Sequence, residues 1–376
     1  MTIYLDYNAT APVRPAVIEA MTEAARRHGN PSSVHASGRA ARHRIEAARR
    51  DIAALIGRDD GDVIFTGSGT EADALAVRGL GRTSIAVSAI EHDAVLAAAP
   101  GAARIPVASD GVVDLCALEA LLSTETPGLV CVMWANNETG AVQPVAEIAR
   151  LAHTAGWLLH VDAVQGAGRL DPAALSEADS IALSAHKLGG PPGVGALLVR
   201  EGLAVTALIG GGGQERGRRS GTENDIGIAG FAVAATIAAQ ERETEVARLS
   251  ALRSRIEDGV RRRATDVRIP GGDADRLCNT VSVALPGVAA ETQVMTLDLA
   301  GIAVSAGSAC SSGKVKRSHV LDAMFPGDPV AAEAIRVSLG WNSTMDDCDR
   351  FLHAWGAMRD RLSPVARPSN AESVPE

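Results

Sequence analysis

Lys187 is the first residue of this chain whose position suggests chemistry. It follows residues 179–184 (DSIALS), an apolar run that predicts a buried strand. A cluster of glycines and prolines at 189–193 comes next, so the lysine lies on a loop at the end of that strand. A lysine in such a place is most often a solvated surface charge. Any reactive role therefore depends on complementary residues elsewhere in the sequence.

A loop of small residues, 65–72 (FTGSGTEA), joins a predicted strand to a predicted helix. Without bulky side chains the backbone can approach an anion, and the first-turn N–H groups near Gly69 and Thr70, together with the helix dipole, favour phosphate. Two other interpretations stay open. The loop also matches the G-x-G-x-x-A dinucleotide fingerprint, with Glu91 placed as a ribose-binding acid. Alternatively, Thr70 simply caps the helix after a tight turn.

Asp162 lies at the end of the predicted strand 157–162, within the motif 160–165 (HVDAVQ). At the carboxyl end of a strand in an α/β sheet an acidic side chain points into the ligand crevice, although the same position also suits a helix cap. A lysine, a phosphate loop and an acid are what pyridoxal phosphate needs, because its aldehyde binds a lysine and an acid keeps its ring nitrogen protonated. A nicotinamide enzyme has no use for the lysine, so the combination favours pyridoxal phosphate.

Cys310 differs from the other four cysteines in its surroundings. It lies in a small, polar segment, residues 308–313 (SACSSG), whereas Cys131 lies in an apolar run that is typical of a buried, inert thiol. Lys314 and Lys316 follow closely and favour the thiolate, which is the nucleophilic form. The pattern predicts that Cys310 takes part in nucleophilic catalysis.

The overall composition narrows the class of protein. The chain has 376 residues, of which 46% are hydrophobic and 22% charged, as in an ordinary globular protein. A net charge of −9 argues against a DNA-binding surface. No apolar run reaches the length of a membrane span, and the first residues lack the pattern of a signal peptide. The five cysteines form neither a disulfide framework nor a zinc-binding pattern, so we expect a cytoplasmic protein with reduced thiols.

The predicted elements alternate between strand and helix through the first half of the chain. Short apolar runs separated by helical stretches indicate a mostly parallel sheet covered on both faces. The predicted strands are 3–5, 62–66, 84–89, 129–134, 157–162, 181–184 and 196–200, and the predicted helices are 16–28, 38–56, 70–81, 92–99 and 144–155.

A long helix, predicted over 224–263, follows a four-glycine loop, and the pattern then changes. The later part suits a smaller α+β domain, with short strands at 277–285, 302–305 and 335–339 and helices near 290–300, 317–324 and 346–362. We expect a large domain over 13–250 and a small domain formed by 1–12 and 251–362. Residues 363–376, rich in proline, serine and glutamate, are expected to form a flexible tail.

The motifs, taken in order, resemble the cysteine desulfurases of the NifS/IscS type, which are pyridoxal-phosphate enzymes of fold type I in the class V aminotransferase family. The resemblance covers nearly the whole chain. The matching motifs are 5–10 (LDYNAT), 29–35 (GNPSSVH), 65–73, 91–92, 136–140 (NNETG), 160–165, 184–187 (SAHK), 219–222 (RSGT), 308–312 (SACSS) and 336–340 (RVSLG). The resemblance implies a large domain with a mostly parallel seven-stranded sheet and a smaller α+β domain.

The resemblance also assigns roles within the cofactor site. Lys187 binds the cofactor aldehyde, His92 lies over the ring and moves protons, and Cys310 is the nucleophile. The residues that hold pyridoxal phosphate are Gly69, Thr70, Asn137, Asp162, Gln165, Ser184, His186 and Thr222, with Asp162 on the ring nitrogen and Asn137 and Gln165 on the ring hydroxyl.

The resemblance also implies a contact between subunits and a binding site for the substrate carboxylate. Thr222 reaches the phosphate site of a neighbouring subunit, which implies a homodimer. Asn30 and Arg336 bind the substrate carboxylate, for which an arginine fork has the right geometry.

The reaction implied by the resemblance removes sulfur from L-cysteine, giving L-alanine and a persulfide on Cys310. That sulfur passes to an acceptor or scaffold protein for Fe–S cluster assembly or another thiolation. No metal is required, although Cys310 could share an Fe–S cluster with a partner. One alternative is another fold-type-I lyase or aminotransferase, such as a selenocysteine lyase; an aminotransferase needs no thiol. A non-catalytic scaffold subunit is a second alternative, against which Lys187, Asp162, His92 and Cys310 argue together.

Overall fold

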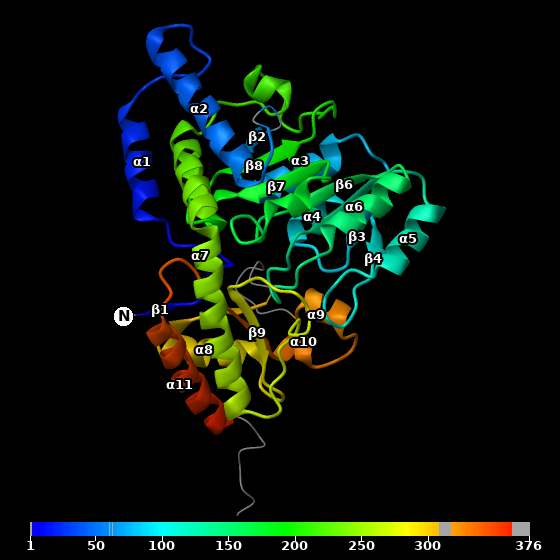
Figure 1. The fold of residues 1–376 in the computed structure, drawn as a ribbon, viewed down its shortest axis with the longest axis vertical. Coiled ribbons are helices and arrows are strands. Elements are labelled where there is room, and N and C mark those ends of the chain that lie inside the picture. The colour runs from blue at the N-terminus through cyan, green and yellow to red at the C-terminus, as the bar shows by residue number, and fades with distance from the viewer. Residues whose placement is uncertain (1, 60, 62, 308–316, 363–376) are drawn as a thin grey trace, which may run out of the picture.

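A seven-stranded sheet forms the centre of the larger part of the molecule (Figure 1). The structure is a computed structural model that describes residues 2–59, 61, 63–307 and 317–362. The strand order is β2-β8-β7-β6-β5-β3-β4, and neighbours pair in parallel except at β8, which is antiparallel to β2 and β7. The strands are β2 (Val63–Thr66), β3 (Ile85–Ser88), β4 (Ala103–Ile105), β5 (Leu129–Met133), β6 (Leu158–Asp162), β7 (Ser180–Ser184) and β8 (Gly195–Val199). The expected mostly parallel, seven-stranded sheet is confirmed.

Helices cover both faces of this sheet, as a sheet with two apolar faces requires. One face packs against α3 (Gly69–Gly79) and α4 (Asp93–Ala98). The other packs against α1 (Pro15–Arg26), α2 (Ala36–Leu55), α5 (Leu115–Thr124), α6 (Val145–Thr154) and the first part of α7 (Asp225–Arg263). Short 3-10 turns lie at Pro172–Leu175, Ala185–Lys187 and Gln214–Gly217.

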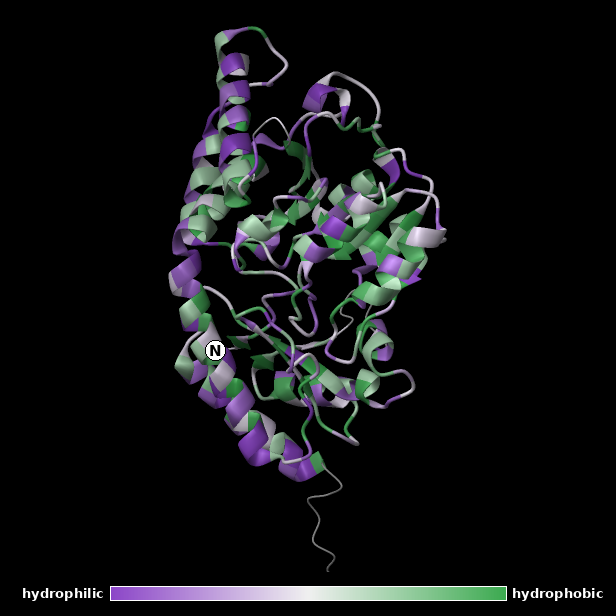
Figure 2. Cartoon of the chain, turned by 45° about the vertical axis from the view of Figure 1, so that its right-hand side comes forward, coloured by the Kyte–Doolittle hydropathy of each residue, from purple (hydrophilic) through white to green (hydrophobic). Residues whose placement is uncertain are grey.

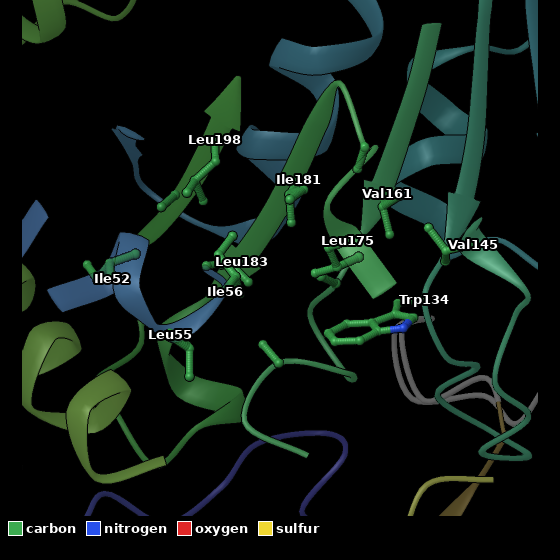
Figure 3. Packing of buried hydrophobic residues seen from close by; sticks show 14 of the residues in the cluster. Ile52, Leu55, Ile56, Trp134, Val145, Val161, Leu175, Ile181, Leu183 and Leu198 are labelled. Carbon is green, nitrogen blue, oxygen red and sulfur yellow. The ribbon is translucent and has the colours of Figure 1, made fainter. Parts of the chain in front are cut away.

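The two faces of the sheet follow the alternation of side chains along each strand. On β6, Leu159 and Val161 join the core beneath α2 and α6, whereas Leu158 joins the core beneath α3. His160 and Asp162 therefore lie on the α3 side. Figure 3 shows the opposite, apolar layer, in which side chains of α2 pack close to those of the strands (Ile52, Leu55, Ile56, Ile181, Leu183 and Leu198).

The smaller part of the molecule is built on two small sheets. Antiparallel strands β9 (Thr280–Ala284), β11 (Ser305–Ala306) and β12 (Ala334–Ser338) lie in the order β11-β12-β9, and β1 (Ile3–Tyr4) pairs in parallel with β10 (Ile302–Ala303). The helices are α8 (Ala290–Leu299), α9 (His319–Met324), α10 (Val330–Glu333) and α11 (Met345–Leu362). The strand predicted at 302–305 is thus two strands, because Ile302–Ala303 pairs with β1 and Ser305–Ala306 turns to β12.

Helix α7 connects the two parts, running from beside α1 and α2 down to α8 and α11 (Figure 1). Ile228 and Phe231 belong to the core of the large sheet, and Ile256 and Val260 to the core of the small one. Much of its exposed surface is hydrophilic (Figure 2). The predicted domain division at 250/251 falls within this helix and stays a prediction; Leu249, just before it, already packs in the core of the smaller part. Within the described ranges, no helix has the length and apolar character that a membrane crossing requires.

Candidate active site

A cavity of about 370 Å³ opens where β5, β6 and β7 end, in line with the rule that ligands bind at the carboxyl ends of strands. Most sequence-predicted site residues meet there, although they are far apart in the chain: Gly69, Thr70, His92, Asn137, Asp162, Gln165, Ser184, His186, Lys187 and Arg336. A larger hollow of about 640 Å³ between α8 and α11 contains none of the predicted site residues. The smaller cavity is therefore the candidate site.

Lys187 lies in the 3-10 turn that follows β7 and is held by the N-terminal segment. Its Nζ donates hydrogen bonds to the carbonyl oxygens of Asn8, at 2.6 Å, and Ala9, at 2.8 Å. Gln165 Nε2 donates to the same Asn8 oxygen at 3.0 Å. The N-terminal segment thus fixes the amine at the cavity wall.

Asp162 presents a buried carboxyl to the cavity from the end of β6. Its Oδ1 accepts a hydrogen bond from the Val164 N–H at 2.9 Å. Burial raises the pKa of Asp162, while that hydrogen bond and the charges of His92 and Lys187 act in the opposite direction. A protonated ring nitrogen opposite this carboxyl would supply the positive charge that burial makes necessary.

His92 both caps a helix and lines the cavity. Its Nδ1 accepts a hydrogen bond from the Ala94 N–H at 3.1 Å, so a neutral ring carries its proton on Nε2. The position of His92 at the start of α4 is thus compatible with a role at the site.

The N-terminus of α3 forms the anion-binding side of the cavity. Ser68 caps this helix, because its Oγ accepts from the Glu71 N–H at 3.1 Å; the interpretation of Thr70 as the cap is wrong. Thr70 lies instead in the first turn, where N–H groups are available to a phosphate.

Small and neutral groups complete this side. A Cβ added to Gly69 would lie 3.1 Å from a Val164 methyl carbon and 3.2 Å from the Ser184 Cβ, so glycine leaves the room that a phosphate needs. Burial, followed by the charge of Lys187, lowers the pKa of His186 to about 4. His186 is therefore neutral at physiological pH and can donate an N–H without adding charge.

Arg336 brings a guanidinium to the cavity and is only 3% exposed. Its Nη2 pairs with Asp6 Oδ1 at 2.8 Å, and its Nη1 donates to the Asn137 carbonyl at 3.2 Å. Its Nε is buried and has no hydrogen-bond partner among the described residues. A buried guanidinium with an unfilled donor fits a carboxylate ligand.

Three predicted site residues are not part of this cavity as described. Asn30 is exposed, and its Oδ1 accepts from the Ser32 N–H at 2.9 Å. Thr222 is also exposed and lies outside the cavity lining. Cys310 falls outside the described residues.

Two residues at the site escaped the sequence analysis. Asn8 is buried and donates through Nδ2 to the Asn137 carbonyl and to Thr280 Oγ1, at 3.0 and 2.9 Å. Asp73, on the buried face of α3, lines the cavity and contacts His160. The available signals were an asparagine within the motif at 5–10 and an acid at a position of α3 that otherwise faces apolar residues.

Glu91 decides against the dinucleotide interpretation. It is fully buried, and its Oε1 accepts from the Met133 N–H at 2.7 Å. Burial above all raises the pKa of Glu91 to about 8, and the fully buried side chain is not placed to bind a ribose. Over the described ranges, no cluster of three or more His, Cys, Asp or Glu side chains could hold a metal ion.

The groups present fit pyridoxal phosphate. An amine, a buried carboxyl and the N-terminus of a helix face one cavity, from Lys187, Asp162 and the turn at Gly69. These are the contacts that an aldehyde, a ring nitrogen and a phosphate require.

Comparison with known sequences identifies the family of the chain. The family model "Aminotransferase class-V" matches residues 3–351. A cysteine desulfurase of Cereibacter sphaeroides is 44% identical over 389 residues, covering 99% of this chain and 99% of that protein. An IscS-like cysteine desulfurase of Mycobacterium tuberculosis is 42% identical over 369 residues, covering 93% of this chain and 94% of that protein.

Solved structures show the same fold. A NifS-like protein from Rickettsia africae has a TM-score of 0.88 at 35% identity, covering 96% of this chain and 100% of that one. A second NifS-like protein has a TM-score of 0.87 at 36% identity, covering 95% and 99%. The chain therefore belongs to the class V aminotransferase family, among the pyridoxal-phosphate-dependent cysteine desulfurases of the NifS/IscS type.

Proposed function

We propose that this chain is a cysteine desulfurase that takes sulfur from L-cysteine, releases L-alanine and holds the sulfur on Cys310 as a persulfide. One observation carries the proposal: Lys187, Asp162 and Arg336 converge on one buried cavity at the N-terminus of α3. Together they suit an amino acid bound beside a phosphorylated aldehyde. The curated relatives at 44% and 42% identity bear the same name.

The residues of the cavity divide the work of activating the substrate. Pyridoxal phosphate, when bound, accepts the electrons left behind by the broken Cα–H bond. Asp162 favours the protonated form of the ring nitrogen, and Arg336 orients the substrate carboxylate. Lys187 yields its place to the substrate amine and then removes the α-proton. The Asn8 and Ala9 carbonyls keep the displaced amine within reach of that proton.

The sulfur-transfer step belongs to Cys310. Its thiolate attacks the substrate sulfur, so an S–S bond forms as the substrate Cβ–S bond breaks. The electron pair of the broken bond stays with the three-carbon product, which takes up one proton at Cβ and regains a proton at Cα to become L-alanine. Cysteine and a thiol thereby become alanine and a persulfide, without an external oxidant or reductant.

The active form is proposed to be a homodimer in which Thr222 serves the neighbour's phosphate site. Its exposed position, outside the cavity of its own chain, supports this. Large apolar side chains are also exposed on or just before α1, α2 and α7, which lie side by side (Figure 1): Ile18, Val34 and Ile226. A second copy of the chain would cover them.

The sulfur acceptor and the compartment are parts of the same proposal. We expect an acceptor or Fe–S scaffold protein to take the persulfide sulfur, and no metal to be needed for the reaction. The four cysteines within the described residues are free thiols, which supports the reducing environment of the cytoplasm (Cys116, Cys131, Cys278 and Cys348).

The deciding experiment measures alanine formed from L-cysteine by the purified protein. We expect a yellow, borohydride-reducible chromophore in the wild type and in Cys310→Ser, with alanine formed by the wild type alone. Cys116→Ser, which changes an exposed cysteine, is the matched control and should stay active. Wild-type rates in Cys310→Ser would refute the role of Cys310. A preference for L-selenocysteine, or amino transfer to a 2-oxo acid, would favour the alternative enzymes.

A further inference from the structure

A second carboxyl lies at the cofactor cavity and has no part in the reaction described above. Asp73 lines the cavity from α3 and is 2% exposed. Its Oδ1 lies 3.2 Å from His160 Nε2, and His160 Nδ1 lies 2.9 Å from Ser180 Oγ. Asp73 is therefore the cavity end of a buried chain of three polar side chains.

This chain is fixed by the sheet. His160 is the register partner of Cys131 on β5 and of Ser180 on β7, so the three form a row across the strands. Alternation along β6 places His160 on the same face as Asp162, two residues on. Helix α3 covers that face and brings Asp73 onto the row. The arrangement therefore follows from strand register and helix packing.

The charges around Asp73 favour its protonated form. Burial first, and then the neighbouring carboxyls of Asp162 and Glu91, raise the pKa of Asp73 well above its ordinary value. Burial lowers the pKa of His160 to about 3, so the imidazole is neutral and brings no compensating charge. Among the described residues, the titratable groups that face Asp73 or share its cavity are His160, Asp162, Glu91, Cys131, His92, His186, Lys187 and Arg336.

We propose that Asp73 and His160 form a proton-holding pair whose proton leaves when a positively charged ring binds beside Asp162, so that cofactor binding is coupled to pH through Asp73. The O–H bond of the Asp73 carboxyl breaks, the proton passes to solvent buffer, and no other bond changes. Asp73 is thus a positioning residue that sets the charge around Asp162. The inference rests on pyridoxal phosphate being the cofactor of the proposed function.

The direction of the coupling follows from the charges. Without cofactor, burial and the neighbouring Asp162 carboxyl favour the protonated form of Asp73, because they raise its pKa. A protonated ring nitrogen adds a positive charge beside the Asp162 carboxyl and near that of Asp73, which lowers the pKa of Asp73. Binding therefore releases part of a proton, and the affinity for cofactor increases with pH. An asparagine at this position keeps the shape and the contact with His160 but has no proton to release.

The test counts protons as the full-length chain, freed of cofactor, binds pyridoxal phosphate. Calorimetric titrations at pH 8 in buffers of different ionisation enthalpy give the number of protons released by wild type, Asp73→Asn and Asp73→Ser. Absorbance of the Lys187-bound chromophore gives the affinity from pH 6.5 to 8.5. Asp179→Asn is the control, because Asp179 is equally buried but pairs with His153 and Arg200, outside the cavity lining.

We expect wild type and Asp179→Asn to release more protons than either Asp73 variant, by up to about one per cofactor. Their affinity should also increase more steeply with pH. A purely structural role for Asp73 would lower the melting temperature and leave the proton count unchanged. Equal proton counts with a normal chromophore would overturn this inference alone. Failure of every form, wild type included, to develop the chromophore would overturn the cofactor assignment and this inference with it.

Discussion

At the scale of single residues, the candidate site consists of polar groups that are already oriented by the protein. The Lys187 amine donates to two backbone carbonyls, and the Asp162 carboxyl accepts from a backbone N–H. Arg336 is held by Asp6 and by the Asn137 carbonyl, yet its Nε has no hydrogen-bond partner among the residues that the structure describes. Such pre-organisation lowers the cost of placing substrate and cofactor, because little has to move when they bind.

The unfilled donor of Arg336 leads to a prediction for Arg336→Lys. Lysine keeps the charge but loses the fork that matches a carboxylate. A hydrogen bond to a charged group contributes about 1.5 to 3 kcal/mol, so we expect KM for L-cysteine to increase by roughly tenfold to hundredfold. The effect on kcat should be smaller. Steady-state kinetics check this, with Arg268→Lys as the control, since Arg268 is 39% exposed and pairs with Asp328 away from the cavity. An unchanged KM in Arg336→Lys would show that another group binds the carboxylate.

At the scale of elements, the turn at Gln214–Gly217 shows how the fold holds a strained segment in place. Glu215 and Arg216 have left-handed backbone angles, with φ of 47° and 56°. The Glu215 carboxylate accepts from Arg49 Nη1 at 2.8 Å, from Arg49 Nη2 at 3.0 Å, and from the Phe65 N–H at 2.9 Å. A buried ion pair therefore fastens the turn to edge strand β2, a few residues before Thr222.

We predict that Glu215→Gln lowers the free energy of unfolding. The substitution removes the buried anionic partner of the Arg49 guanidinium, whose side chain is 6% exposed, and leaves it only the half-exposed Glu46, at 3.3 Å. Breaking a buried pair in this way costs about 3 to 5 kcal/mol. The control is Asp349→Asn. Asp349 forms an exposed pair with Arg255, and their side chains are 47% and 43% exposed, so the cost should be at most about 1 kcal/mol. Urea denaturation of both variants measures the difference, and equal losses would contradict the argument.

The sequence predicted elements where local patterns decide them. Strands β5 (LVCVM) and β6 (LLHVD) are largely apolar runs, and the predicted helix over 224–263 matches α7 almost to the residue. Strand β4, helix α5 and helix α10 were missed. β4 is a three-residue edge strand and α10 has four residues, while α5 (LCALEALLST) is too evenly apolar to show a helical period. Short or featureless segments take their structure from tertiary packing.

The site was predictable where chemistry requires particular residue types, as at Lys187 and Asp162. The contacts of Asn8 and Asp73 were not, because they depend on which segments the fold brings together. Asn8 meets Asn137 and Thr280 only through the path of the N-terminal segment, and Asp73 meets His160 only through the packing of α3 on β6. No local pattern encodes either distance.

At the scale of the whole molecule, the site lies where two cores meet. The N-terminal segment starts in the smaller part of the molecule. In that part β1 pairs with β10, and Asp6 forms a β-bridge with Ser338 of β12. The segment then crosses to the large domain. There the Ala11 N–H donates to the His186 carbonyl at 2.8 Å, beside Lys187. Arg336 on β12, the residue proposed to bind the substrate carboxylate, thereby lines the same cavity as Asp162 and Lys187 of the large sheet. In the proposed homodimer, Thr222 of the neighbouring subunit would also contribute to the site.

Mixed dimers test whether Thr222 acts in the neighbouring subunit. Lys187→Ala and Thr222→Glu should each be inactive alone, the second because a carboxylate would face the phosphate. If Thr222 serves the neighbour, a dimer of one Lys187→Ala and one Thr222→Glu subunit has one intact site, since the intact Lys187 lies opposite the intact Thr222. Random exchange of subunits should then restore about one quarter of wild-type activity per subunit, because half of the dimers are mixed and half of their sites are intact. If Thr222 serves its own subunit, each site carries one defect and no activity returns.

The control mixes wild type with the double variant Lys187→Ala/Thr222→Glu. There the trans arrangement spoils both sites of every mixed dimer, so activity falls to about half of that expected from the wild-type subunits alone. Opposite results in the two mixtures are what an exchange of residues across a two-fold axis requires, whereas a loss of stability in one variant would change both mixtures alike.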